Sequence, residues 1–186
     1  MTPLSDFIYS GGLRNYICLA KDLHVGSIQL LEPKPCGRFE SLVPDQFLSD
    51  NEKHILTEFM REVNSGRVYK DYPQVSYIAH YEMPDLMGCQ MGGLSTLYID
   101  SAGNLNPCPF VPISFGKIMR EGFIPIYHRM RAAVPSPLRK QCPSVALKEV
   151  IANYRQDSSG STVPYSAVKS VWEKMYSPNE SQIVPQ

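Results

Sequence analysis

The chain has 186 residues, of which 43% are hydrophobic and 19% charged, so it can bury a core and form one domain or two small ones. Eighteen basic residues balance eighteen acidic ones, which argues against a general electrostatic attraction to nucleic acid or to an anionic membrane. No stretch approaches the roughly 20 apolar residues of a membrane span, and residues 1–6 lack the pattern of a secretory signal. We therefore expect a cytoplasmic protein with no nucleic-acid or membrane partner. Five cysteines, an odd number, argue against a disulfide framework and favour metal binding or burial.

The first third of the chain is expected to alternate helix and strand. Apolar residues between positions 13 and 23 fall on one face of a helix, and residues 27–31 form a short apolar run typical of a buried parallel strand. Ser49 and Glu52 have the spacing of a capping box, and apolar residues then recur at helical spacing until Gly66. The first helix and strand together make half of a βαβ unit.

A β-hairpin is expected in the middle third. Residues 75–81 and 94–100 mix β-branched and aromatic side chains and are predicted to be strands. Residues 101–104 then form a turn, because Gly103 and Asn104 adopt positive φ angles more readily than other residue types. This reversal of the chain brings the following cysteine alongside the preceding strand.

The last third is predicted to be mainly helical. A helix is expected over residues 117–131, and Pro125 should either divide it or begin its second segment. The other expected segments are an irregular proline-rich stretch at 109–116, helices at 145–154 and 165–175, a linker at 157–161 and a frayed tail at 177–186.

Three cysteines, Cys89, Cys108 and Cys142, are the candidate metal ligands. Cys89 is followed by thirteen residues, a glycine and four more residues before Cys108, so the predicted hairpin lets these two converge on one ion or cluster. Arg139 and Lys140 precede Cys142, and their positive charge is expected to favour the thiolate that binds metal. This arrangement indicates a metal or iron–sulfur site.

The stretch from Gly93 to Phe110, with Cys89 before it and Cys142 after it, resembles the auxiliary-cluster region of radical S-adenosylmethionine proteins, in the C-terminal extensions called SPASM or twitch domains. Residues 27–38 are similar to the last strand of the barrel in these proteins and to the loop that leaves it. The resemblance implies an α+β chain that contains the last helix and strand of a partial (β/α) barrel, followed by a β-hairpin and helices. The implied parts are a barrel remnant at residues 1–72, an auxiliary-cluster domain at 73–155, and a linker, short helix and tail at 156–186.

The same resemblance implies a C-terminal part of an oxidoreductase or maturase, whose substrate and reaction type it does not define. Members of the family hold the catalytic cluster with a Cys-x3-Cys-x2-Cys loop, which this sequence lacks, so the chain is not expected to cleave S-adenosylmethionine alone. The resemblance implies that a separately encoded N-terminal half would supply this function. In its presence, Gln29 and Leu30 on the last barrel strand would face S-adenosylmethionine.

By the resemblance, Cys89, Cys108 and Cys142 would hold an auxiliary 4Fe-4S cluster. Three thiolates leave one iron open to a substrate amine or carboxylate, or to a further protein ligand. The candidates for that ligand are His80, Glu82, Asp85 and His128.

Several alternatives stand beside this hypothesis. The three cysteines could form a zinc site that His80 or His128 completes, or they could simply be buried without a metal. Cys18 and Cys36 are interpreted as core residues, since free cysteine is among the most buried residue types. The alternatives to this function are a stand-alone electron-transfer or partner-binding module and a structural remnant without cofactor, so the sequence leaves open whether the chain acts as an enzyme.

Overall fold

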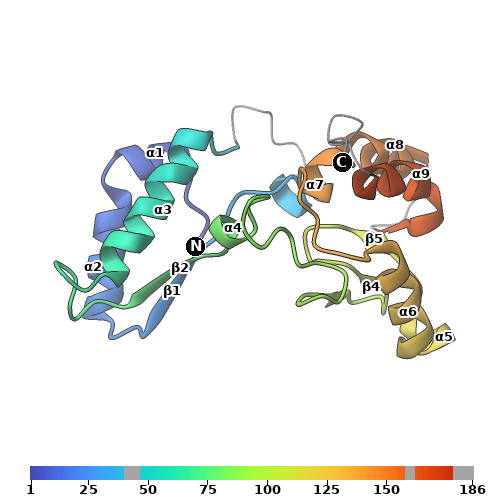
Figure 1. Cartoon of the computed structure of the whole chain (residues 1–186), viewed down its shortest axis with the longest axis horizontal. Coiled ribbons are helices and arrows are strands. Elements are labelled where there is room, and N and C mark those ends of the chain that lie inside the picture. Colours follow the sequence, from blue (N-terminus) through green and yellow to red (C-terminus); the bar gives the residue numbers. More distant parts are fainter. Residues whose placement is uncertain (40–46, 158–161, 178–186) are drawn as a thin grey trace, which may run out of the picture. The chain divides into compact units, whose positions relative to one another are not determined.

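Helices and short strands alternate along the chain (Figure 1) in a computed structural model that describes residues 1–39, 47–157 and 162–177. This mixture agrees with the expected α+β class at the level of helix and sheet content. Two units are defined by their internal contacts: the first comprises Met1–Lys34 and Arg38–Met83, and the second comprises Pro35–Gly37 and Pro84–Gln186. The first unit thus extends past residue 72, where the sequence suggested a boundary.

A βαβ unit forms the centre of the first unit. Strands β1 (Ser27–Leu30) and β2 (Gln74–Tyr77) pair in parallel, with Ile28 opposite Val75, and the long helix between them makes the crossover (Figure 1). The helical elements are α1 (Ser5–Tyr9), α2 (Gly12–Asp22), α3 (Asp50–Asn64) and α4 (Ile78–Tyr81). A 3-10 turn, η1 (Gly37–Phe39), follows β1. Within the described residues, the sheet is this parallel pair and no complete barrel is present.

The predicted capping box starts helix α3. The side-chain oxygen of Ser49 accepts a hydrogen bond from the backbone N–H of Glu52 at 3.3 Å, and the Glu52 carboxylate accepts one from the backbone N–H of Ser49 at 2.7 Å. The helix then buries Leu56, Met60 and Val63 against the sheet and α2. The helix predicted after the capping box is therefore confirmed as α3, and the helix predicted at residues 13–23 is confirmed as α2.

Strand β2 was predicted to run to residue 81, and this is wrong beyond Tyr77. The next four residues form α4, so Tyr77, which is fully buried, is the last residue of the strand. The resemblance also implied that the chain leaves the sheet after β1. Instead, the chain returns through α3 to the sheet and forms β2. Parallel pairing across a crossover this long leaves no local signal in the sequence.

Both outer edges of the parallel pair have hydrogen-bond partners. The amino group of Met1 donates to the Gln29 carbonyl at 2.8 Å, and the Met1 carbonyl accepts from the N–H of Leu31 at 2.8 Å. This is the pattern that a parallel strand makes. On the other edge, the side-chain amide of Asn64 donates to the Val75 carbonyl at 2.8 Å and accepts from its N–H at 2.9 Å.

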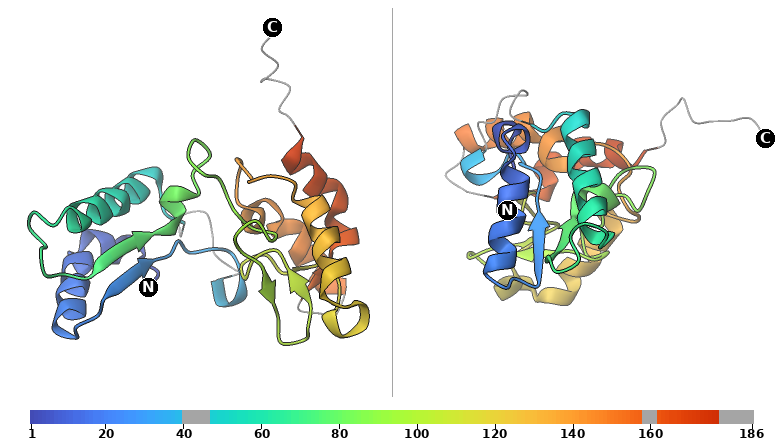
Figure 2. Two further views of the ribbon diagram at one scale, coloured as in Figure 1. Left: turned by 60° about the horizontal axis from the view of Figure 1, so that its bottom comes forward. Right: turned by 90° about the vertical axis from the view of Figure 1, so that its left-hand side faces the viewer.

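Helices pack around short strands in the second unit (Figure 2). Its strands are β3 (Tyr98–Ile99), β4 (Leu105–Asn106), β5 (Ile113–Ser114) and β6 (Val163–Pro164). Its helices are α5 (Ile118–Glu121), α6 (Phe123–Ala133), α7 (Pro143–Ala146), α8 (Lys148–Asp157) and α9 (Tyr165–Tyr176). Trp172 is fully buried in the core, where its indole N–H donates to the Ala133 carbonyl at 2.9 Å.

The predicted hairpin is confirmed at its turn but is shorter than expected. Strands β3 and β4 are antiparallel, and Gly103 has a φ of 76° in the turn that joins them. Residues 94–97 are not strand, because the chain turns there and its backbone bonds back to residue 90. The stretch at 109–116 is not wholly irregular, since β5 pairs in parallel with β6.

The remaining helix predictions have mixed outcomes. Pro125 lies in the first turn of α6, which a break at Gly122 separates from α5. The single helix expected at 145–154 is two helices, α7 and α8, whereas the helix expected at 165–175 is confirmed as α9. The predicted linker beyond residue 157 and the tail beyond residue 177 lie outside the described residues. No helix in the described part of the chain is both long enough and apolar enough to cross a membrane.

Candidate metal centre

The segment that carries Cys89 is fixed against the chain just before Cys142. The backbone N–H of Cys89 donates to the Leu138 carbonyl at 2.9 Å, and the N–H of Leu138 donates back to the Cys89 carbonyl at 3.1 Å. Gly88 permits this approach: a Cβ atom there would lie 3.0 Å from the Leu138 carbonyl oxygen. The Arg139 guanidinium adds hydrogen bonds to the carbonyls of Pro84 and Leu86.

The hairpin that precedes Cys108 is organised by Asp100. Its carboxylate accepts hydrogen bonds from the backbone N–H of Ala102 and Asn104, each at 2.9 Å, from the Asn104 amide at 2.8 Å and from the Thr162 hydroxyl at 3.0 Å. Burial alone would raise the pKa of Asp100, but the bonds from Asn104, Thr162 and Ala102 outweigh it and lower the pKa. The turn is therefore held by an ionised carboxylate.

A further backbone bond links the Cys108 segment to the Cys89 segment. The N–H of Gly92 donates to the carbonyl of Pro107, the residue before Cys108, at 2.9 Å. Cys142 lies four residues after Leu138 and precedes α7, in which the N–H groups of Val145 and Ala146 donate to the Cys142 carbonyl. The three predicted ligands therefore lie on adjoining segments, although the first and the last are 53 positions apart in the sequence.

The three thiols are half-buried and reduced. The N–H of Phe110 donates to the Cys108 sulfur at 3.5 Å, and the Cys142 sulfur lies 3.2 Å from the Ser144 hydroxyl. Across residues 1–39, 47–157 and 162–177, no three His, Cys, Asp or Glu side chains are grouped at the spacing of a metal site. Backbone bonds bring the segments together, while the direction of each thiol depends on one side-chain torsion.

Among the described residues of the second unit, the buried polar atoms without a hydrogen-bond partner include two that bear on the cysteine segments. The hydroxyl of Tyr176 is one; burial, and next the nearby Cys89, raises the pKa of this phenol, so it keeps its proton. The amide oxygen of Asn106, two residues before Cys108, is the other, and this side chain is only 2% exposed. Both side chains can donate to sulfur, Asn106 after a half-turn of its amide. This chemistry fits an iron–sulfur cluster, whose sulfurs accept such bonds.

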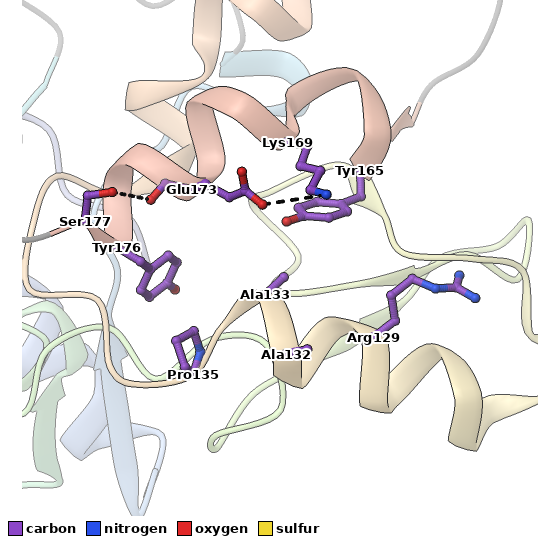
Figure 3. Close-up of a pocket in the computed structure, with 9 residues that line it drawn as sticks. All are labelled: Arg129, Ala132, Ala133, Pro135, Tyr165, Lys169, Glu173, Tyr176 and Ser177. Atoms are coloured by element: carbon purple, nitrogen blue, oxygen red, sulfur yellow. Dashed lines mark hydrogen bonds and ion pairs between the residues drawn. The ribbon is translucent and has the colours of Figure 1, made fainter.

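Tyr176 also lines a cavity of about 600 Å³ between α6 and α9 (Figure 3). Its walls combine the alanines at the end of α6 with Tyr165, Lys169 and Glu173 of α9. The Lys169 ammonium lies 3.8 Å from the Glu173 carboxylate, an exposed pair that leaves both groups available to solvent. The cavity thus has an apolar floor and a charged rim.

The four candidates for a further cluster ligand are divided between the two units. His80 and Glu82 belong to the first unit and therefore do not share a unit with the three cysteines. Asp85 and His128 belong to the second unit, where both side chains are exposed. On β1, Gln29 is exposed whereas Leu30 is fully buried in the core, so the two side chains face opposite sides of the sheet.

A polar cluster at the carboxyl ends of β1 and β2 was not recognised in the sequence. The Tyr77 hydroxyl donates to the Glu32 carboxylate at 2.9 Å, and the Lys34 ammonium pairs with that carboxylate at 2.6 Å. Burial raises the pKa of Glu82; the Lys34 charge lowers it in part, and the Glu32 charge raises it further. Parallel sheets bind ligands at this end, and polar residues just after two apolar strands were the available signal.

Comparisons of the chain with models of protein families, with curated proteins and with solved structures found no match. The residues and geometry of the chain itself therefore carry the functional proposal.

Proposed function

We propose that this chain is the C-terminal part of a radical S-adenosylmethionine enzyme of the SPASM or twitch type, an oxidoreductase or maturase. In this proposal Cys89, Cys108 and Cys142 hold an auxiliary 4Fe-4S cluster. The observation that carries it is the pair of backbone links, from Cys89 to Leu138 and from Gly92 to Pro107, that unites the three cysteine segments. When bound, such a cluster would supply electron transfer or an iron that anchors substrate.

The residues around the thiols have defined tasks in this proposal. The Phe110 N–H already donates to the Cys108 sulfur, and the Tyr176 hydroxyl is a buried donor in need of an acceptor. Hydrogen bonds to the sulfurs of a cluster stabilise its reduced form and so set its potential. Apolar residues that include Met91 and Leu138, both 2% exposed, exclude water from the same region.

The first unit supports the part of the proposal that concerns a barrel. Its two strands are parallel and joined by a helix, as in every repeat of a (β/α) barrel, and Met1 adds to β1 in the parallel pattern. In this proposal, S-adenosylmethionine binds only when a separately encoded N-terminal half that holds the catalytic cluster is present. Gln29, which is exposed on β1, would face S-adenosylmethionine, whereas Leu30 is buried in the core.

Anaerobic reconstitution of the full chain with iron and sulfide tests this function. We expect the purified chain to gain iron, sulfide and a broad absorption band in the visible range. Cys108→Ala should lose most of the iron, while Cys18→Ala, which alters a first-unit cysteine near Tyr72, should retain it. A folded wild-type chain that takes up no iron and sulfide, or equal uptake by the two variants, would refute the proposal.

A further inference from the structure

We propose that a second cavity of the second unit binds an organic acid, with the carboxylate of the ligand beside Arg139 and Lys140 and its apolar body against the apolar part of the wall. The cavity has a volume of about 450 Å³ and is lined by residues 84–85, 136–140 and 175–177, all from this unit. Tyr176 and Ser177, at the end of α9 (Figure 3), line both this cavity and the one described above. A volume of this size is sufficient for a small ligand.

The two cations of the cavity are held in place by backbone carbonyls. Nη1 of Arg139 donates to the carbonyl of Pro84 and, at 2.8 Å, to that of Leu86. The Lys140 ammonium donates to the carbonyl of Ser177, just after α9, at 2.6 Å. These bonds restrict both side chains before any ligand arrives, so binding costs little further side-chain entropy. Because carbonyl oxygens carry no net charge, the bonds leave both positive charges in place.

Both cations can still bind an anion. Within residues 1–39, 47–157 and 162–177, no carboxylate forms an ion pair with Arg139 or Lys140. Arg139 uses only Nη1 in its bonds to the carbonyls, so its Nε and Nη2 groups can still donate. The ammonium of Lys140 also keeps a free donor after its bonds to carbonyls. A carboxylate would supply the missing negative charge and two oxygens that accept these hydrogen bonds.

The rest of the lining favours a ligand with one negative charge and an apolar body. Asp85 lines the same cavity, so its charge offsets one of the two cations and would repel a doubly charged anion such as phosphate more than a single carboxylate. Pro84, Pro137 and the ring of Tyr176 supply apolar surface on which a hydrocarbon group can pack. The chemistry of the wall therefore fits an aliphatic or aromatic carboxylate, either as a free organic acid or as the C-terminal end of a peptide.

Titration of the full chain with phenylacetate, followed in two-dimensional amide NMR spectra, tests this site. We expect saturable shifts of the amide signals of residues around 84–86, 136–140 and 175–177. Phenylacetamide, which lacks the charge, and acetate, which lacks the ring, should each bind about tenfold more weakly. N-acetyl-leucine distinguishes the two sources of the carboxylate: tighter binding than phenylacetate assigns the site to a peptide end, and weaker binding assigns it to a free acid.

Four variants test the charges of the cavity. Arg139→Gln and Lys140→Gln each remove one cation, while the new amide can still donate to the backbone carbonyls, and each should weaken phenylacetate binding by about fivefold. Asp85→Asn removes the opposing charge and should strengthen binding by about two- to fivefold, a gain that a purely structural role would not produce. Lys70→Gln makes the same change of charge at an exposed lysine of the first unit and should leave the affinity unchanged.

The outcomes decide this proposal independently of the proposed function, because the titration needs no iron or sulfide. An absence of saturable shifts, or equal binding of phenylacetate and phenylacetamide, would overturn it. The same holds if Lys70→Gln weakens binding as much as Lys140→Gln, since the anion would then respond only to the total charge of the chain. Circular dichroism checks that each variant is folded. Should the two glutamine variants unfold, the comparison of the ligands on wild type and the gain expected in Asp85→Asn still decide the question.

Discussion

Replacing Gly92 by alanine should destabilise the second unit more than the same change at Gly103. Both glycines have positive φ angles, 68° and 76°, so both substitutions carry a similar backbone cost of about 1–2 kcal/mol. Only Gly92 is also crowded: its Cβ would lie 2.6 Å from Cγ2 of buried Val134, whereas nothing lies closer than 3.9 Å at Gly103. Overpacking of this kind costs about 1–3 kcal/mol more.

The expected loss of unfolding free energy is therefore roughly 2–5 kcal/mol for Gly92→Ala and about 1–2 kcal/mol for Gly103→Ala. Alanine also lowers the conformational entropy of the unfolded chain relative to glycine, which offsets part of the loss in each variant. This contribution is the same in both variants and cancels when their unfolding free energies are compared. Urea unfolding of the apoprotein measures the loss of unfolding free energy in both variants. Trp172 is the only tryptophan and is fully buried in the second unit, so its fluorescence reports this unfolding directly.

A double-mutant cycle isolates the crowding at Gly92. Val134→Ala removes Cγ2 and Cγ1, which would lie 2.6 and 3.0 Å from the new Cβ, but keeps the Val134 Cβ at 2.8 Å. The double variant Gly92→Ala/Val134→Ala should therefore be more stable than the sum of the single effects by about 0.5–3 kcal/mol, without full recovery. Gly103→Ala with Val134→Ala should be additive within about 0.5 kcal/mol. Equal costs at the two glycines, or additivity at Gly92, would refute the reasoning.

Three other substitutions test local interactions. Ser49→Ala removes the side-chain half of the capping box with Glu52 and should lower stability by about 1 kcal/mol, as measured by urea unfolding and far-ultraviolet circular dichroism. The pKa of Asp100 lies below its usual value, so the ionised carboxylate stabilises the fold at pH values above the unfolded-state pKa. This stabilisation is lost as the pH falls through the folded-state pKa. Asp100→Asn should therefore lower the free energy of unfolding at pH 7 and make that free energy depend less on pH in the acid range. Tyr77→Phe removes the hydrogen bond to Glu32 and should cost about 1 kcal/mol in thermal unfolding, whereas an unchanged midpoint would show that water replaces it.

Local signals in the sequence were sufficient for much of the fold. The capping box of α3 and the glycine turn after β3 depend on residues within a few positions of each other, and both are present. Strand extents were predicted less well: β2 stops at Tyr77, and only residues 98–99 of the strand expected at 94–100 are paired. Those limits are set by packing against distant segments, which local propensity does not contain.

The candidate site was predictable in part. The spacing from Cys89 to Cys108 predicted the reversal of the chain between them, and the hairpin is present. The approach of the third cysteine depends on the pairing of Cys89 with Leu138, for which the sequence has no marker.

The two edges of the β1–β2 sheet differ in how a further strand could join. In a parallel sheet, alternate residues direct their N–H and C=O groups to opposite sides, and β2 uses Gln74 to bond toward β1. The outward groups of Val75 are both occupied by the Asn64 side chain, which is a device that protects an edge strand. The outer edge of β1 instead accepts Met1 in the parallel pattern. A strand contributed by the proposed N-terminal half would therefore extend the sheet on the β1 side, where it would take the place of Met1 on Gln29 and Leu31, and β2 would stay the edge strand of this pair.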